Sequence, residues 1–158
     1  MLESVATMDV GPTVADLPAP RRVAIATLFR EMRRGEDELA ALYAIGAQRF
    51  TIPYLREKLE ELAELKRARV AALARLTPGL DPAPGPVLAE PPAVLPAPPE
   101  GRAGFFSRAF ETERTLEGAY REVLVLLDDP ARCPDLPALA AGSARHRALL
   151  RDLYLRYS

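Results

Sequence analysis

The chain has 158 residues, of which 49% are hydrophobic, and this is enough for one domain with a buried core. Its 21 Lys and Arg residues nearly balance its 22 Asp and Glu residues, which argues against binding to nucleic acid or to a membrane surface. The single cysteine, Cys133, excludes an internal disulfide bond, and no uncharged apolar run approaches the ~20 residues that cross a bilayer. Because the N-terminus also lacks a signal-peptide pattern, these features predict a cytoplasmic protein.

Residues 1–19 show little periodicity and end in the sequence LPAP, so they are predicted to form an N-terminal arm of uncertain order. Residues 20–158 are predicted to form one all-α domain, a four-helix bundle. The first helix is expected at 20–50, where apolar residues recur in alternating steps of three and four. Its seam is Ile25, Phe29, Met32, Leu39, Tyr43, Gly46 and Phe50, and the charged residue Glu36 fills the remaining step.

The second helix is expected at 53–76, and it carries two cations in its apolar seam. The seam consists of Leu55, Leu59, Leu62, Lys66, Arg69, Leu73 and Leu76. Prolines are too dense between 78 and 100 for a helix to form there. We expect residues 78–102 to be a crossover, because an extended chain at ~3.1 Å per residue can run back along a whole helix. A flexible tether between two separable hairpins is the alternative, but neither hairpin could bury its seam alone.

The third helix is expected at 104–128 and the fourth at 136–156, with Asp135 as the N-terminal cap of the fourth. The seam of the third helix is Phe106, Ala109, Glu113, Leu116, Tyr120, Val123 and Leu127. The seam of the fourth is Leu136, Leu139, Ser143, His146, Leu150, Leu153 and Tyr157. Both seams again contain polar residues at an intermediate position.

The two halves of the chain repeat each other at an offset of 77 residues. Glu36 precedes Tyr43 by seven residues, and Glu113 precedes Tyr120 by the same seven, which is two helical turns. The same offset relates Phe29 to Phe106 and many seam leucines to one another, for example Leu59 to Leu136 and Leu73 to Leu150. The sequence therefore predicts two duplicated helical hairpins joined by the Pro-rich crossover.

With this spacing the chain resembles the ferritin-like superfamily, in particular its bacterioferritin and rubrerythrin branch. That family builds a di-iron or di-manganese site from one Glu on each of two helices and a Glu-x-x-His motif on each of the other two. Glu36, Glu113 and His146 stand at positions that match its ligands. Lys66 and Ser143 stand where the two motifs have Glu, and Arg69 stands where the first motif has His.

The charges predict what replaces the metal ions. Lys66 and Arg69 balance Glu36 and Glu113 without any metal, and a divalent ion beside two cations would be repelled by ~3 kcal/mol per pair at 5 Å. We therefore expect buried ion pairs in a polar layer at the former metal site. That layer comprises Glu36, Tyr43, Lys66, Arg69, Glu113, Tyr120, Ser143 and His146.

The resemblance and the missing ligands together predict a non-catalytic protein without a cofactor, serving as a structural or interaction module. Its partner would be a second copy of the chain or another protein. One alternative is a metal-binding oxidoreductase or an iron- or manganese-handling protein, with one Fe, Mn or Zn ion on Glu36, Glu113 and His146. Another is a bundle that binds a partner through the N-terminal arm or the Pro-rich segment. No phosphate loop, dinucleotide fingerprint or serine-nucleophile motif is present.

Overall fold

A computed structural model describes residues 11–76 and 101–158, which form four long helices and contain no strand. The helices are α1 (Ala19–Arg49), α2 (Pro53–Leu76), α3 (Gly101–Leu127) and α4 (Leu136–Tyr157). Two short 3-10 turns, η1 (Val14–Asp16) and η3 (Pro130–Arg132), precede α1 and α4. The predicted all-α class is confirmed for these residues.

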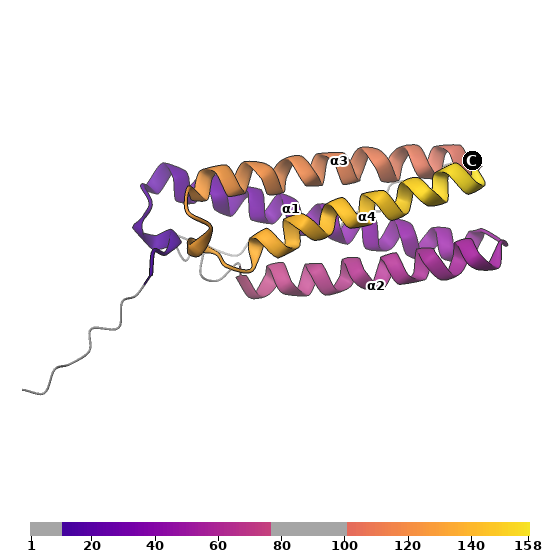
Figure 1. Ribbon diagram of the computed structural model, residues 1–158, viewed down its shortest axis with the longest axis horizontal. Helices are drawn as coiled ribbons and strands as arrows, with labels where there is room; N and C mark the ends of the chain where they lie inside the picture. Colours follow the sequence, from indigo (N-terminus) through magenta and orange to yellow (C-terminus); the bar gives the residue numbers. More distant parts are fainter. Residues whose placement is uncertain (1–10, 77–100) are drawn as a thin grey trace, which may run out of the picture.

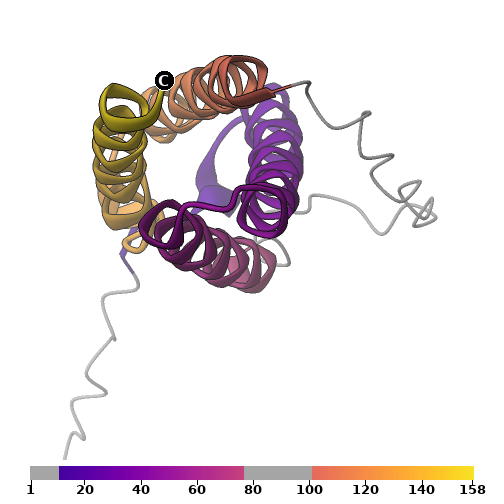
Figure 2. The ribbon, with the colours of Figure 1, turned by 90° about the vertical axis from the view of Figure 1, so that its right-hand side faces the viewer.

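The four helices surround a common axis in the order α1, α3, α4, α2, as the end-on view shows (Figure 2). The most extensive contacts join α1 to α2 and α1 to α3, and among neighbouring helices α2 and α4 have the fewest contacts. Figure 1 shows that α2 ends at one end of the bundle and that α3 begins at the other. Consequently α1 and α4 run in one direction, and α2 and α3 run in the opposite direction.

The core forms where the apolar seams meet on this axis. The buried side chains of α2 are typical, since Leu55, Leu59, Leu62 and Leu73 have no solvent-exposed surface. Burial of each such leucine stabilises the fold by roughly 1.5–3 kcal/mol. The charged or polar residues of the same seams are buried with them, and this sets the level of the candidate site.

The second half of the predicted N-terminal arm, residues 1–19, packs against the bundle. Val14 and Leu17 are buried in the core, and Arg132 Nη1 donates a hydrogen bond to the Thr13 carbonyl oxygen at 2.7 Å. Two apolar residues are too few to show a helical period, so the sequence did not reveal this packing. Residues 1–10 lie outside the described residues.

The helix α3 begins at Gly101, so the predicted boundary at 104 and the crossover range 78–102 are wrong at this end. Gly101 has φ +69°, which glycine adopts without strain, and Phe105 in the second turn of the helix is buried in the core. The remainder of the predicted crossover lies outside the described residues. Asp135 occupies the N-cap position of α4, but its side chain makes no capping hydrogen bond.

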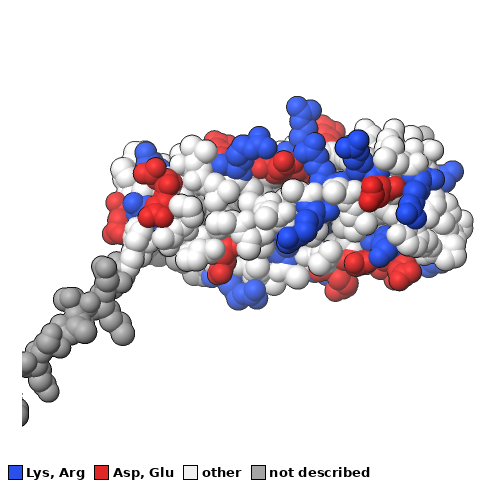
Figure 3. All heavy atoms as spheres, viewed as in Figure 1, with Lys and Arg blue, Asp and Glu red and all other residues white. Residues whose placement is uncertain are grey.

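The surface of the bundle carries charges of both signs. Figure 3 shows basic and acidic side chains interspersed over one face, without a continuous field of one sign. None of the helices in the described part of the chain has the length and the apolar character needed to cross a membrane.

Alanine substitutions at two glycines inside helices, Gly46 and Gly118, test how closely α1 packs against α2 and α3. A Cβ on Gly46 would lie 2.7 Å from Phe105 Cε2 of α3 and 3.0 Å from Leu59 Cδ1 of α2, whereas a Cβ on exposed Gly118 would meet nothing within 4 Å. We expect Gly46→Ala to lower the free energy of unfolding by about 1–2 kcal/mol, because overpacking outweighs the better helix propensity of alanine. Gly118→Ala should raise it by about 0.5–1 kcal/mol. Urea denaturation measures both, and a gain in stability from Gly46→Ala would contradict this packing.

Candidate functional site

The structure brings all eight predicted layer residues together near the middle of the bundle. The helix α1 supplies Glu36 and Tyr43, α2 supplies Lys66 and Arg69, α3 supplies Glu113 and Tyr120, and α4 supplies Ser143 and His146. The charged side chains are inside the protein, because Glu36 and Lys66 are 0% exposed, Glu113 is 1% exposed and Arg69 is 6% exposed.

Lys66 lies between the two carboxylates. Its Nζ atom is 3.1 Å from Glu36 Oε2, 3.0 Å from Glu113 Oε1 and 3.1 Å from Glu113 Oε2. Only the last contact also has hydrogen-bond geometry, so Glu36 Oε2 is held by charge attraction without a directed hydrogen bond. One ammonium group thus neutralises carboxylates from two different helices.

Arg69 links α1 to α4. Its Nε atom donates to Glu36 Oε1 at 2.6 Å, and Nη2 donates to Ser143 Oγ and to the Leu139 carbonyl oxygen, both at 2.7 Å. The guanidinium carbon also lies 5.1 Å from the centroid of the Tyr120 ring, within the range of a cation–π contact. The predicted pairing of Lys66 or Arg69 with Glu36 or Glu113 is therefore present for both cations.

Each of the two tyrosines binds a glutamate from the other half of the chain. The Tyr43 hydroxyl donates to Glu113 Oε1 at 2.8 Å, and the Tyr120 hydroxyl donates to Glu36 Oε1 at 2.9 Å. Burial, followed by the charge of the neighbouring carboxylate, raises the pKa of both tyrosines above the usual value of 10.0, so both remain donors at neutral pH. Each half thus supplies the hydroxyl group that binds the carboxylate of the other.

The four formal charges of the layer sum to zero, but removing any one of them is expected to destabilise the fold strongly. Two carboxylates and two cations have been removed from water, and removing one member of such a set typically costs 3–5 kcal/mol, because the other charge is left buried and unpaired. Hydrogen bonds from Tyr120 and Arg69 to Glu36 Oε1, and from Tyr43 to Glu113 Oε1, add to the charge attraction of Lys66.

His146 lies at the edge of the layer and is 9% exposed. Burial first, and then the positive charges of Lys66, Arg69 and Arg145, lower its pKa to about 3. The imidazole is therefore neutral at pH 7. Its Nδ1 atom is buried and has no hydrogen-bond partner among the described residues.

In the alternative of one Fe, Mn or Zn ion on Glu36, Glu113 and His146, the metal would have to displace Lys66 from the two carboxylates. Within residues 11–76 and 101–158, no group of three or more His, Cys, Asp or Glu side chains could hold a metal ion. The physical reason is that Lys66 lies within hydrogen-bonding distance of both carboxylates and repels a second cation.

Two features around Arg69 were not predicted from the sequence, namely a backbone acceptor and the space that a glycine leaves. The Leu139 carbonyl oxygen accepts a hydrogen bond, which side-chain patterns cannot reveal. Gly142 provides space, because a Cβ at this position would lie 2.6 Å from Arg69 Nη1. A glycine on a buried face next to the Ser143 position was the available signal for a close approach from another helix.

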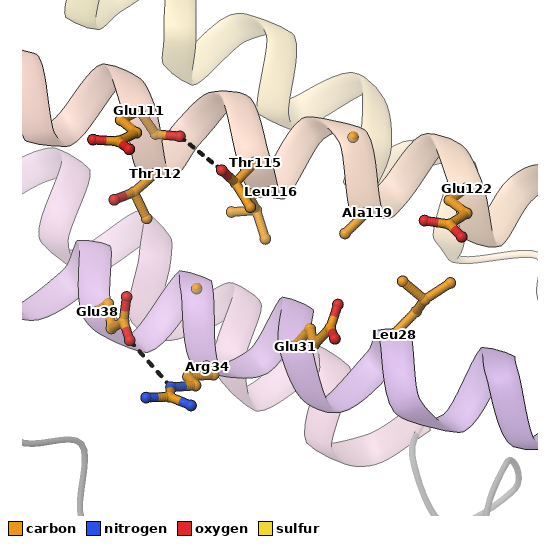
Figure 4. Close-up of a pocket in the computed structure, with 12 residues that line it drawn as sticks. Leu28, Glu31, Arg34, Glu38, Glu111, Thr112, Thr115, Leu116, Ala119 and Glu122 are labelled. Atoms are coloured by element: carbon orange, nitrogen blue, oxygen red, sulfur yellow. Dashed lines mark hydrogen bonds and ion pairs between the residues drawn. The ribbon is translucent and has the colours of Figure 1, made fainter.

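A second candidate surface is an open groove between α1 and α3 (Figure 4). Leu28, Leu116 and Ala119 lie in it, and the carboxylates of Glu31, Glu38, Glu111 and Glu122 lie around it. Arg34 pairs with Glu38 at 3.2 Å. None of the eight layer residues lines this groove, so it is separate from the ion-pair layer.

No family model, curated protein or solved structure matches this chain. The resemblance to the ferritin-like superfamily therefore rests on the spacing of residues in the sequence.

The neutral state of His146 predicts a dependence of stability on pH. The pKa of His146 is about 3 in the folded protein and about 6.5 in an unfolded chain, so between these values the unfolded state binds more protons. Stability should consequently fall as the pH falls from 6.5 to 5, and His146→Gln should reduce this slope by up to ~1.4 kcal/mol per pH unit. His146 is the only histidine, so its imidazole NMR signals can be followed directly. They should not titrate above pH 5, and a midpoint near 6.5 would contradict the burial described here.

Proposed function

We propose that this chain is a ferritin-like bundle in which Lys66 and Arg69 replace a di-metal centre, and that it acts as a structural or interaction module without catalytic activity. The observation that carries the proposal is the position of Lys66 Nζ, within 3.1 Å of Glu36 and 3.0 Å of Glu113. In the family that the chain resembles, the two matching glutamates bind metal ions. An ammonium group between them supplies the positive charge that a metal ion would supply.

The reciprocal tyrosine contacts support the duplication. Tyr43 and Tyr120 are 77 residues apart, as are Glu36 and Glu113, and each tyrosine binds the glutamate of the other half. Two hairpins related by an approximate two-fold axis would produce such an exchange. A bundle assembled from four unrelated helices has no reason to produce it.

The directions of the helices support the family topology. The helices α2 and α3 run in the same direction, and the end of α2 lies at the opposite end of the bundle from the start of α3 (Figure 1). Ferritin-like folds have one long crossover between their second and third helices, and this gives the same directions.

We infer that the protein acts by binding a partner at its surface, because the buried layer is fully occupied. Both carboxylates of the layer are occupied by cations and tyrosine hydroxyls, which leaves no exchangeable position for a reacting group. The open groove between α1 and α3 is suited to a protein partner, a second copy of the chain included. Its carboxylates would favour a partner segment with basic side chains.

The proposal predicts that the metal site can be restored. The combined variant Lys66→Glu, Arg69→His and Ser143→Glu completes both Glu-x-x-His motifs beside Glu36 and Glu113. It should bind about two divalent ions per chain. Without metal it should be less stable than the parent, because four carboxylates would share a poorly solvated layer. Addition of Fe²⁺ or Mn²⁺ should raise its melting temperature by binding to the folded state.

Metal analysis and thermal unfolding measure these outcomes. The matched control places Gln at positions 66, 69 and 143, which removes the cations without adding anionic ligands, and it should not bind two ions per chain. The parent should likewise show no metal-dependent rise in melting temperature. A folded triple variant that binds no metal would contradict the proposed alignment, and tight binding of one ion by the parent would favour the alternative site on Glu36, Glu113 and His146.

A further inference from the structure

The pair of neighbouring helices with the least contact, α2 and α4, is separated by a groove of about 700 Å³. This groove is distinct from the one between α1 and α3. Small and apolar side chains cover most of its walls, namely Leu65, Ala68, Ala72, Leu76, Ala138 and Leu139. Arg69 and His146 also line it, so the groove reaches the edge of the buried ion-pair layer.

Two guanidinium groups converge beside Gly142 at the floor of this groove. The point that a Gly142 Cβ would occupy lies 2.6 Å from Arg69 Nη1 and 3.8 Å from Arg145 Nη2. Arg69 is 94% buried, since only 6% of its surface is exposed. Its Nε and Nη2 atoms are engaged in hydrogen bonds, but Nη1 donates to none of the residues that the structure describes. One side of a buried cation is thus left with free N–H donors next to a second cation.

The charges around this point are not balanced within the described residues. Glu36 neutralises Arg69, whereas Arg145 forms no ion pair with any residue described in the structure. Arg75, which also lines the groove, has no such partner there either. The one acidic residue of the lining is Asp135, seven residues before Gly142 on α4 and therefore about 10 Å along the helix axis. His146 is neutral at pH 7 and contributes no charge.

We propose that this groove binds a small organic carboxylate with an apolar body. The carboxylate group lies between Arg69 Nη1 and Arg145, where it accepts hydrogen bonds from both guanidinium groups. The apolar body extends along Ala68, Ala72 and Leu139 towards Leu76, over a length of up to about 12 Å on α2. The absence of a side chain at Gly142 is what leaves room for the Arg69 guanidinium at this point. This site does not depend on the origin of the Lys66 ion pairs.

The test is a titration of the protein with octanoate, followed by the imidazole NMR signals of His146, the single histidine of the chain. Saturable shifts are expected, because the imidazole lines the groove next to the proposed carboxylate position. Arg145→Ala should weaken binding by about tenfold or more, the typical effect of losing one charged hydrogen bond. Arg147→Ala is the matched control on the same helix, since Arg147 pairs with Glu117 and does not line the groove. It should change affinity by less than about twofold.

Two further probes separate the head group from the apolar body. Neutral 1-octanol and inorganic phosphate should each bind more weakly than octanoate. Equal binding of 1-octanol would overturn the role of the guanidinium groups, and equal binding of phosphate would overturn the role of the apolar walls. Absence of saturation with octanoate, or an unchanged affinity in a correctly folded Arg145→Ala variant, would overturn the site itself.

Discussion

The bundle depends on neutralising two carboxylates, Glu36 and Glu113, in the middle of a core that water does not reach. An ionised carboxylate that is moved from water into such a place costs several kcal/mol, and two of them repel each other. Lys66 lies about 3 Å from both and Arg69 holds the second oxygen of Glu36, so the four formal charges sum to zero. Because these residues come from α1, α2 and α3, the pairing also fixes how the three helices align.

The layer combines an approximately symmetric frame with an asymmetric set of cations. Each half supplies one glutamate and one tyrosine, and each tyrosine binds the other half's glutamate. The cations come from α2 alone, since Ser143 and His146 occupy the corresponding positions of α4. Arg69 reaches across to α4 to bind Ser143 and the Leu139 carbonyl, and Gly142 leaves room for it. The loose contact between α2 and α4 and the groove between them accompany this asymmetry.

Much of this arrangement could be predicted from the sequence, because a regular seam makes a charged residue conspicuous. Glu36, Lys66 and Glu113 each interrupt an apolar period, so their burial and pairing followed from the helical repeat. The packing of Val14 and Leu17 could not be predicted, since a short segment shows no period. The hydrogen bond from Arg69 to the Leu139 carbonyl could not be predicted either, because every residue has a backbone carbonyl and the side-chain pattern does not indicate which one accepts.

The role of Lys66 is measured most directly by the effect of Glu113→Gln on the free energy of unfolding at pH 7, in the parent and in Lys66→Met. In the parent the substitution leaves the layer with an excess positive charge, so it should lower stability by about 3 kcal/mol or more. In Lys66→Met it removes one of two carboxylates that face the single cation Arg69, so it should raise stability. The glutamine still accepts the Tyr43 hydrogen bond in both backgrounds. An effect of the same sign in both backgrounds would show that Lys66 does not hold the two carboxylates together.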